Sequence, residues 1–314
     1  MSARVHIALA AAMLAGAGVS VPSVPASPTP LMDWPDLLGR PMPAATKRIR
    51  YGDKASQFAD LWLPDAPGPH PVVVMVHGGC WRSKIAKLTI MNYAAEDLRR
   101  RGIAVWNIEY RGVDQAGGGY PGTFADVAAA ADALRGVAQT YRLELKNTVA
   151  FGHSAGGHLA MWLAARPRLP PSSLLASRDP LPIAAVISSG GLPDLKADRS
   201  AKDAACGAEV IGLLTGAPSP GRSDVYADTS PAERLPIGVR QEIVNGRQDP
   251  IAPPWLGAHW TDRARSAGDD VRLTIIESTG HVELISPGAP AWSREVEMIE
   301  RWLRSSPNRR GPAP

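Results

Sequence analysis

The chain has 314 residues, of which 45% are hydrophobic, and a formal net charge of +4 at pH 7. This length suits one large α/β domain with a substantial core, and the Gly and Pro residues fall between candidate elements, which excludes a collagen-like or low-complexity chain. The small basic excess is scattered and is not interleaved with aromatic residues, so nucleic-acid binding is not expected.

The N-terminus has the layout of a secretory signal peptide. Arg4 and His6 precede an uncharged apolar run from Ile7 to Val21, and Val24-Pro25-Ala26 supplies the small residues of a cleavage site. The run is shorter than the roughly 20 residues of a membrane span. We therefore predict a signal peptide over 1–26 and a mature protein in the periplasm or outside the cell, without stable membrane insertion. An uncleaved anchor or a lipoprotein is the alternative, the latter disfavoured because no Cys lies near the cleavage point.

Residues 27–46 are rich in Pro, Ser and Ala and are predicted to form a linker, with a short helical turn near Asp33 to Leu38. The main domain is expected over 47–304. It opens with an antiparallel hairpin formed by Arg48–Tyr51 and Phe58–Leu63.

Buried strands and helices then alternate along the chain. Apolar runs without polar alternation are typical of strands buried on both faces of a parallel sheet. The predicted strands are Val72–Val76, Ile103–Ile108, Thr148–Phe151, Ile183–Ile187, Gln241–Val244 and Val271–Ile276, and the predicted helices are Ile85–Arg101, Phe124–Tyr141, Ala155–Ala165 and Ala291–Leu303. This pattern predicts an α/β fold, a mainly parallel central sheet with helices on both faces. Residues 192–236 break the rhythm and are a candidate insertion or partial cap, and the polar tail 305–314 is predicted to be disordered.

One segment has the pattern of a nucleophile elbow. Gly152-His153-Ser154-Ala155-Gly156 places Gly-x-Ser-x-Gly between a predicted strand and a predicted helix. A sharp turn there holds the serine in a strained conformation and aims the amides of the helix N-terminus at a developing oxyanion. Alone, the pattern fits a Gly-rich helix cap equally well.

A second segment favours the catalytic interpretation. His77-Gly78-Gly79 directly follows a buried strand, one βα unit before the elbow. In hydrolases such a loop donates backbone N–H groups to the oxyanion. We expect an oxyanion hole formed by the amides of Gly78, Gly79 and Ala155.

The remaining catalytic candidates follow the last two strands. Asp249 comes after the next-to-last strand and His281 after the last, which gives the chain order Ser154, Asp249, His281 of an α/β-hydrolase. Asp194, which follows another strand, is the rival acid. No His, Asp or Glu cluster has metal-ligand spacing, so neither a metal nor another cofactor is expected.

The chain has two cysteines, Cys80 and Cys206. In an oxidising compartment they can form a disulfide, which is slightly favoured over two unpaired thiols.

Two motifs resemble those of a known family. His77-Gly-Gly-Cys-Trp81 and Gly152-His-Ser-Ala-Gly-Gly-His158 resemble the motifs of α/β-hydrolase esterases with a His-Gly-Gly-x-Trp loop, the acetyl and feruloyl esterases and the kynurenine formamidase-like hydrolases. The resemblance covers roughly residues 48–303. The chain departs from the hormone-sensitive-lipase type, which usually has a third Gly where Cys80 stands.

The sequence therefore predicts a serine esterase that cleaves carboxylic esters with short acyl groups. Trp81 is expected to line the substrate pocket beside the loop of the expected oxyanion hole, and a purely packing role is the alternative. The partner of the esterase is a small-molecule ester. The alternatives are an exported peptidase or amidase of the same fold, a lipase with a lid, and a binding module without catalytic activity. The oligomeric state does not follow from the sequence.

Overall fold

The computed structural model describes residues 30–200 and 206–304. The predicted signal peptide, the first residues of the predicted linker and the predicted disordered tail lie outside the described residues.

The core of the fold is a sheet of eight strands in the order β1-β2-β4-β3-β5-β6-β7-β8. β1 and β2 form the predicted antiparallel hairpin, β2 is antiparallel to β4, and all later pairs are parallel. The strands are β1 (Lys47–Arg50), β2 (Phe58–Trp62), β3 (His70–Val76), β4 (Ala104–Ile108), β5 (Leu143–His153), β6 (Ala185–Ser189), β7 (Arg240–Gly246) and β8 (Val271–Ile276). The predicted α/β-hydrolase sheet is confirmed.

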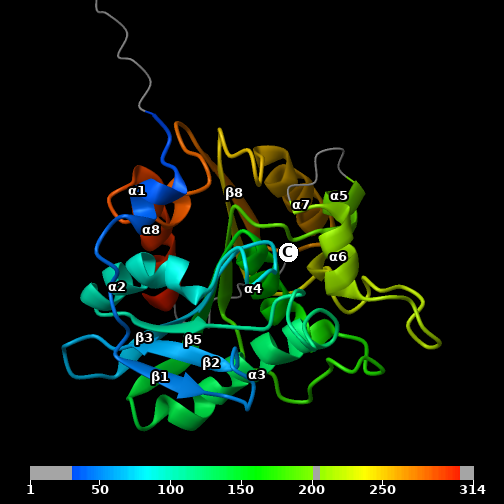
Figure 1. The fold of residues 1–314 in the computed structure, drawn as a ribbon, viewed down its shortest axis with the longest axis horizontal. Helices are drawn as coiled ribbons and strands as arrows, with labels where there is room; N and C mark the ends of the chain where they lie inside the picture. Colours follow the sequence, from blue (N-terminus) through cyan, green and yellow to red (C-terminus); the bar gives the residue numbers. More distant parts are fainter. Residues whose placement is uncertain (1–29, 201–205, 305–314) are drawn as a thin grey trace, which may run out of the picture. The chain divides into compact units, whose positions relative to one another are not determined.

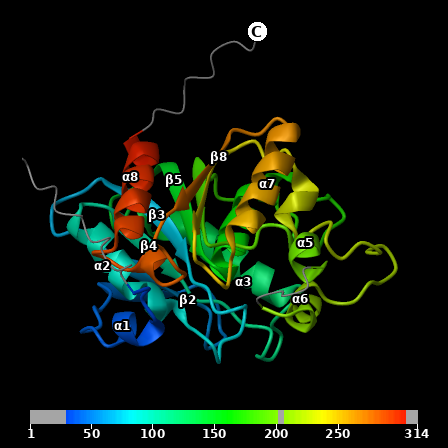
Figure 2. The same cartoon turned by 90° about the horizontal axis from the view of Figure 1, so that it is seen from above.

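Helices cover both faces of this sheet (Figures 1 and 2). One apolar core joins the sheet to α3, α4 and α7, and a second joins the other face to α1, α2 and α8. The helices are α1 (Trp34–Leu38), α2 (Asn92–Arg100), α3 (Gly122–Ala138), α4 (Ala155–Ala165), α5 (Leu195–Ser200), α6 (Ala208–Thr215), α7 (Pro254–Ser266) and α8 (Pro290–Arg304). Short 3-10 turns lie at η1 (Leu88–Met91), η2 (Arg166–Arg168), η3 (Pro231–Arg234) and η4 (Glu283–Ile285).

The uninterrupted apolar run of β3 supplies both cores at once. Val74 and Val76 belong to the first core, whereas Val73 and Met75 belong to the second. Successive side chains of a strand point to opposite faces, so a strand covered on both sides favours apolar residues at every position.

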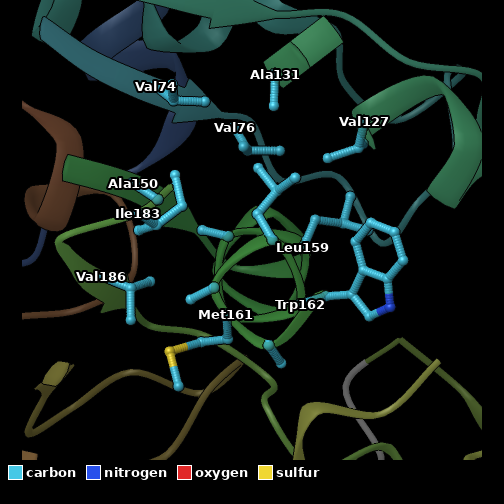
Figure 3. Packing of buried hydrophobic residues seen from close by; sticks show 14 of the residues in the cluster. Val74, Val76, Val127, Ala131, Ala150, Leu159, Met161, Trp162, Ile183 and Val186 are labelled. Carbon is cyan, nitrogen blue, oxygen red and sulfur yellow. The ribbon is translucent and has the colours of Figure 1, made fainter. Parts of the chain in front are cut away.

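Helix α4 is buried along its whole length. Figure 3 shows Leu159, Met161 and Trp162 of this helix among side chains of the sheet and of α3. A helix that is apolar all round belongs in the interior of a protein. The first residue of α4 follows Ser154, so the nucleophile candidate is attached to a helix that is buried throughout.

Three regions differ from the expectations drawn from the sequence. The helix expected over 85–101 begins only at η1 and α2, and Ile85 lies on the surface next to the site described below. Helix α7 was not foreseen, although Leu256, Trp260 and Ala264 place one apolar residue on each turn. The helical turn expected near Asp33 to Leu38 is present as α1, but Leu37 of this helix is fully buried, so this part of the expected linker 27–46 packs into the domain. The compact unit accordingly begins at Leu31.

The segment 192–236 contains α5, α6 and η3 in its described parts. It packs beside α4: the ring nitrogens of His158 and Trp162 bond to the carbonyls of Thr229 and Asp228, at 2.8 and 2.9 Å. None of the helices in the described part of the chain has the length and apolar character needed to cross a bilayer.

Glu295 of α8 is a fully buried carboxyl group, and it makes folding sensitive to pH. Burial raises the pKa of Glu295 well above its ordinary value of 4.5, although the nearby Ser189 hydroxyl acts in the opposite direction. The folded protein therefore keeps a proton that the unfolded chain releases above pH 4.5. Above pH 4.5 the free energy of unfolding therefore falls by about 1.4 kcal/mol per pH unit, until the pH reaches the pKa of Glu295 in the folded protein.

We expect Glu295→Gln to unfold at a higher temperature than the native protein near neutral pH. The difference should shrink as pH falls toward the unfolded pKa, because the native carboxyl is then protonated in both states. Thermal unfolding followed by circular dichroism across this pH range measures it, with the exposed Glu297→Gln of the same helix as control. A difference that does not change with pH would contradict the prediction.

Candidate active site

Ser154 lies at the turn from β5 into α4, with φ 56° and ψ −126°. Few residues other than Gly adopt positive φ, and such strain is found mainly at functional sites. The turn requires glycine on both sides of the serine: a Cβ on Gly152 would collide with the carbonyl of Gly156, and one on Gly156 with the carbonyl of Val76. The Ser154 amide donates to the Ser189 carbonyl of β6 at 2.9 Å, which fixes the elbow to the sheet.

His281 and Asp249 meet although they come from separate loops. Asp249 follows β7, His281 follows β8, and Nδ1 of His281 lies 2.6 Å from Oδ2 of Asp249. The other carboxylate oxygen of Asp249 accepts the amides of Ile251 and Ala252, at 2.8 and 2.9 Å. Burial tends to raise the pKa of Asp249, but the hydrogen bonds and the charge of His281 outweigh it, so the pKa is lowered. An ionised Asp249 keeps the proton of His281 on Nδ1 and leaves Nε2 free to accept one.

The rival acid, Asp194, has different partners. It forms an ion pair with Arg263 and lies 3.3 Å from Nε2 of His259, both on α7. Asp194 is therefore engaged with α7, and the carboxylate hydrogen-bonded to His281 is that of Asp249.

His153, next to the nucleophile, packs against His281. The two ring centroids are 4.3 Å apart, and Nε2 of His153 lies 3.0 Å from the His281 carbonyl oxygen. Burial, together with the nearby His281, lowers the pKa of His153 to about 3. His153 is therefore uncharged at neutral pH, and Nε2 carries the proton that it donates to the carbonyl.

The loop after β3 is held by a buried polar cluster. Nε2 of His77 lies 3.0 Å from a carboxylate oxygen of Glu109, and Nδ1 lies 2.7 Å from the Gly78 carbonyl. The Tyr110 hydroxyl donates to the His77 carbonyl at 2.9 Å, and the two rings stack. Burial tends to raise the pKa of Glu109, but His77 and the amides of Leu88 and Tyr110 outweigh it and lower the pKa.

The same loop has a strained backbone. Gly79, Cys80 and Trp81 have φ values of 105°, 49° and 53°. A Cβ on Gly78 would lie 2.8 Å from that of Ser154, so the loop passes against the nucleophile and only glycine allows this approach. Ala155 is the first residue of α4, and an amide at this position has no partner within its helix. Of the residues expected to form the oxyanion hole, Gly78 and Ala155 thus lie directly beside Ser154.

A disulfide joins this loop to the segment before α6. Cys80 and Cys206 are bonded, with their Cα atoms 5.2 Å apart, which is within the usual range. The bond closes a loop with a sequence separation of 126 residues and so strongly restricts the unfolded chain. It ties residues 77–81, the loop expected to donate amides to the oxyanion (the oxyanion loop), to a region far away in the sequence.

Ser154 and His281 open into a common cavity of about 290 Å³. Its lining is mostly apolar and comes from the N-terminal segment, the oxyanion loop and the loop after β7. The lining residues are Trp34, Leu38, Gly79, Cys80, Ile85, Ala86, Ile90, His153, Ser154, Ile251 and His281.

Trp81 is not part of this lining, and here the structure differs from the prediction. Its side chain is fully buried in the core and its ring packs edge-on against that of His158, with 5.5 Å between centroids. Cys80 and Trp81 both have positive φ, and the indole of Trp81 lies in the core of the domain. Within residues 30–200 and 206–304, no group of His, Cys, Asp or Glu side chains is placed to hold a metal ion.

The BD-FAE family model matches residues 59–257, which is more than half of the chain. The chain belongs to the BD-FAE family. This family membership and the fold confirm the predicted esterase-like α/β-hydrolase. The match includes Ser154 and Asp249 but ends before His281 and begins after α1.

Solved esterases share the fold of this BD-FAE member. A truncated carbohydrate esterase from gut microbiota is similar with a TM-score of 0.69 and 19% identity, over 82% of this chain and 95% of that chain. Esterase B from Lactobacillus rhamnosis is similar with a TM-score of 0.68 and 18% identity, over 81% of this chain and 83% of that chain. Thermogutta terrifontis esterase 2 phosphonylated by sarin is similar with a TM-score of 0.67 and 19% identity, over 87% of this chain and 97% of that chain. No match to a curated protein was found.

Sequence reasoning missed the residues that surround the triad candidates. Trp34 and Leu38 lie in a segment expected to be a linker, and Ile85 in a segment expected to be helical. Glu109 begins a Glu-Tyr-Arg segment directly after a buried strand. A charged residue at the end of such a strand is a signal that it could lie near the site. The contact of His153, at the end of β5, with His281 joins residues 128 apart in the chain, for which the sequence gives no signal.

Proposed function

We propose that this BD-FAE member is a serine esterase that hydrolyses carboxylic esters with short acyl groups through Ser154, His281 and Asp249. The observation that carries the proposal is the 2.6 Å contact between His281 and Asp249 beside a strained serine elbow. A serine hydroxyl is a weak nucleophile, and a neighbouring histidine oriented by a carboxylate is the usual means of activating it.

The first half of the reaction forms an acyl-enzyme. Nε2 of His281 takes the proton of Ser154 as Oγ bonds to the ester carbonyl carbon, and Asp249 stabilises the charged imidazole. The amides of Gly78, Gly79 and Ala155 stabilise the oxyanion. The bond to the alcohol oxygen then breaks, and His281 returns the proton to the departing alcohol.

The second half releases the acid. His281 takes a proton from water as the water oxygen bonds to the acyl carbon. The bond to Ser154 breaks, and its oxygen regains the proton from His281. No cofactor is needed for either half, and the residues that act are the same.

The size and lining of the cavity support a short, uncharged acyl group. Its volume of about 290 Å³ lies just below the range of pockets that hold drug-sized ligands. Apart from the two histidines, its lining residues carry no ionisable side chain.

The proposal also includes export by the signal peptide expected over 1–26, which is consistent with a disulfide in the mature chain.

The test is hydrolysis of p-nitrophenyl esters from acetate to decanoate, together with labelling by a fluorophosphonate. We expect turnover to be highest for short esters and the label to be found on Ser154 by mass spectrometry. A p-nitroanilide of the same acid is the matched amide substrate. Faster cleavage of the anilide would favour an amidase, and neither turnover nor labelling would favour a binding module.

A further inference from the structure

The segment that precedes the first strand is attached to the loop that carries His281. One carboxylate oxygen of Glu283 accepts the amide of Met32 at 2.6 Å, and the other accepts the amide of Gly280 at 3.0 Å. Gly280 immediately precedes His281, so a single side chain fixes both. Figure 1 shows α1, in blue, beside the orange loop that leads into α8.

The other end of this segment is anchored as well. The guanidinium of Arg40 donates to the Pro287 carbonyl at 2.9 Å, and the Tyr93 hydroxyl donates to the Arg40 carbonyl at 3.1 Å. Between the two anchors, Leu37 is fully buried and Asp33 caps α1. Contacts at both ends and in the middle make α1 a fixed part of the domain.

Helix α1 forms one side of the cavity beside Ser154. Trp34 meets the rings of His153 and His281 edge-on, with centroids 6.3 and 6.4 Å apart, and Leu38 lines the same cavity. We propose that α1 is the specificity-determining wall of the acyl pocket, with Trp34 and Leu38 limiting the length of the acyl group. This inference rests on the esterase function proposed above.

Another part of the cavity lining comes from residues that follow the oxyanion loop. Ile85, which is 61% exposed, and Ala86 face the same cavity as Leu38, which is 42% exposed. An exposed apolar pair at the mouth of an apolar cavity is a surface that an apolar ligand would cover.

The acyl part of the ester suits this cavity better than the alcohol part. The acyl group stays bonded to Ser154 through both halves of the reaction, whereas the alcohol must leave before water attacks. A small cavity with a fixed wall suits the group that remains, and its apolar lining favours a hydrocarbon chain.

Two changes at Leu38 test the wall without removing a buried side chain. We expect Leu38→Ala to raise kcat/KM for p-nitrophenyl octanoate relative to acetate by about tenfold, since a few methylene groups in an apolar pocket discriminate by this order. Leu38→Trp should lower the same ratio by about tenfold. Leu213→Ala is the matched control, because Leu213 is similarly exposed, at 49%, but lies on α6, away from the cavity.

Trp34→Ala should change the ratio in the same direction as Leu38→Ala, and Trp34→Phe should restore part of the native preference. Thermal unfolding of each variant verifies that it is folded. Unchanged ratios in active, folded variants would overturn the inference while leaving the esterase function intact, whereas a native protein without turnover would remove both. The same variants are also assayed with acetate esters of longer alcohols. If the Leu38 substitutions changed kcat/KM only in that alcohol series, the assignment of the cavity to the acyl group would be overturned.

Discussion

Ser154→Ala is expected to lower kcat/KM for short p-nitrophenyl esters by about 10⁴-fold or more. The change removes the single oxygen that would bond to the substrate, while the amides of the expected oxyanion hole remain. Alanine keeps a Cβ at this position, so the substitution does not relieve the backbone strain of the elbow. Initial rates with purified protein, compared with the uncatalysed rate, measure the loss, and fluorophosphonate labelling should disappear with it.

A buried serine near the elbow provides the control. Ser188 is fully buried in β6 and its hydroxyl lies against Gly157 of α4. Ser188→Ala should keep activity within a few-fold of the native protein and keep the label. A Ser154→Ala protein with more than a tenth of the native activity would mean that another group is the nucleophile.

The central part of the fold could be predicted because its signals are local. An apolar run such as Val72–Val76 can lie only where both faces of a strand are covered, and the structure places it in the middle of the sheet. The order of Ser154, Asp249 and His281 relative to their strands follows from the same pattern, because the carboxyl ends of parallel strands lie at one edge of the sheet.

The short helical turn of α1 could be expected from the sequence, but its place at the wall of the cavity could not. Helix α1 has five residues, too few for a periodic pattern, and its neighbours are rich in Pro. Its position depends on Glu283, which is 251 residues from Met32. The Pro-rich composition indicates an extended chain, and tertiary contacts override that indication.

Trp81 illustrates the opposite error, an assignment by proximity in sequence. It lies four residues after His77 in a loop that surrounds the site, but the backbone turns it into the core. Trp34, far away in the sequence, is the tryptophan that lines the cavity. Backbone conformation decides which side of a loop a side chain occupies, and strained φ values are not visible in composition.

Asp249→Asn is the second change with a large expected effect, about 10³- to 10⁴-fold in kcat. The two amides of Ile251 and Ala252 need an oxygen acceptor, so the asparagine would turn its carbonyl oxygen toward them. Its NH₂ group would then face Nδ1 of His281 and donate to it. The proton of the ring would move to Nε2, and His281 could no longer accept the proton of Ser154.

Asp194→Asn is the matched control, since it makes the same change at the rival acid. Its kcat should fall by less than about tenfold, because Asp194 pairs with Arg263 and His259 and so holds α7 in place without contacting the triad candidates. Steady-state rates of both variants, together with their unfolding temperatures, separate lost chemistry from lost stability. If Asp194→Asn abolished turnover in a folded protein while Asp249→Asn kept it, the acid would be Asp194, and the Asp249–His281 contact would hold the loop without orienting the base.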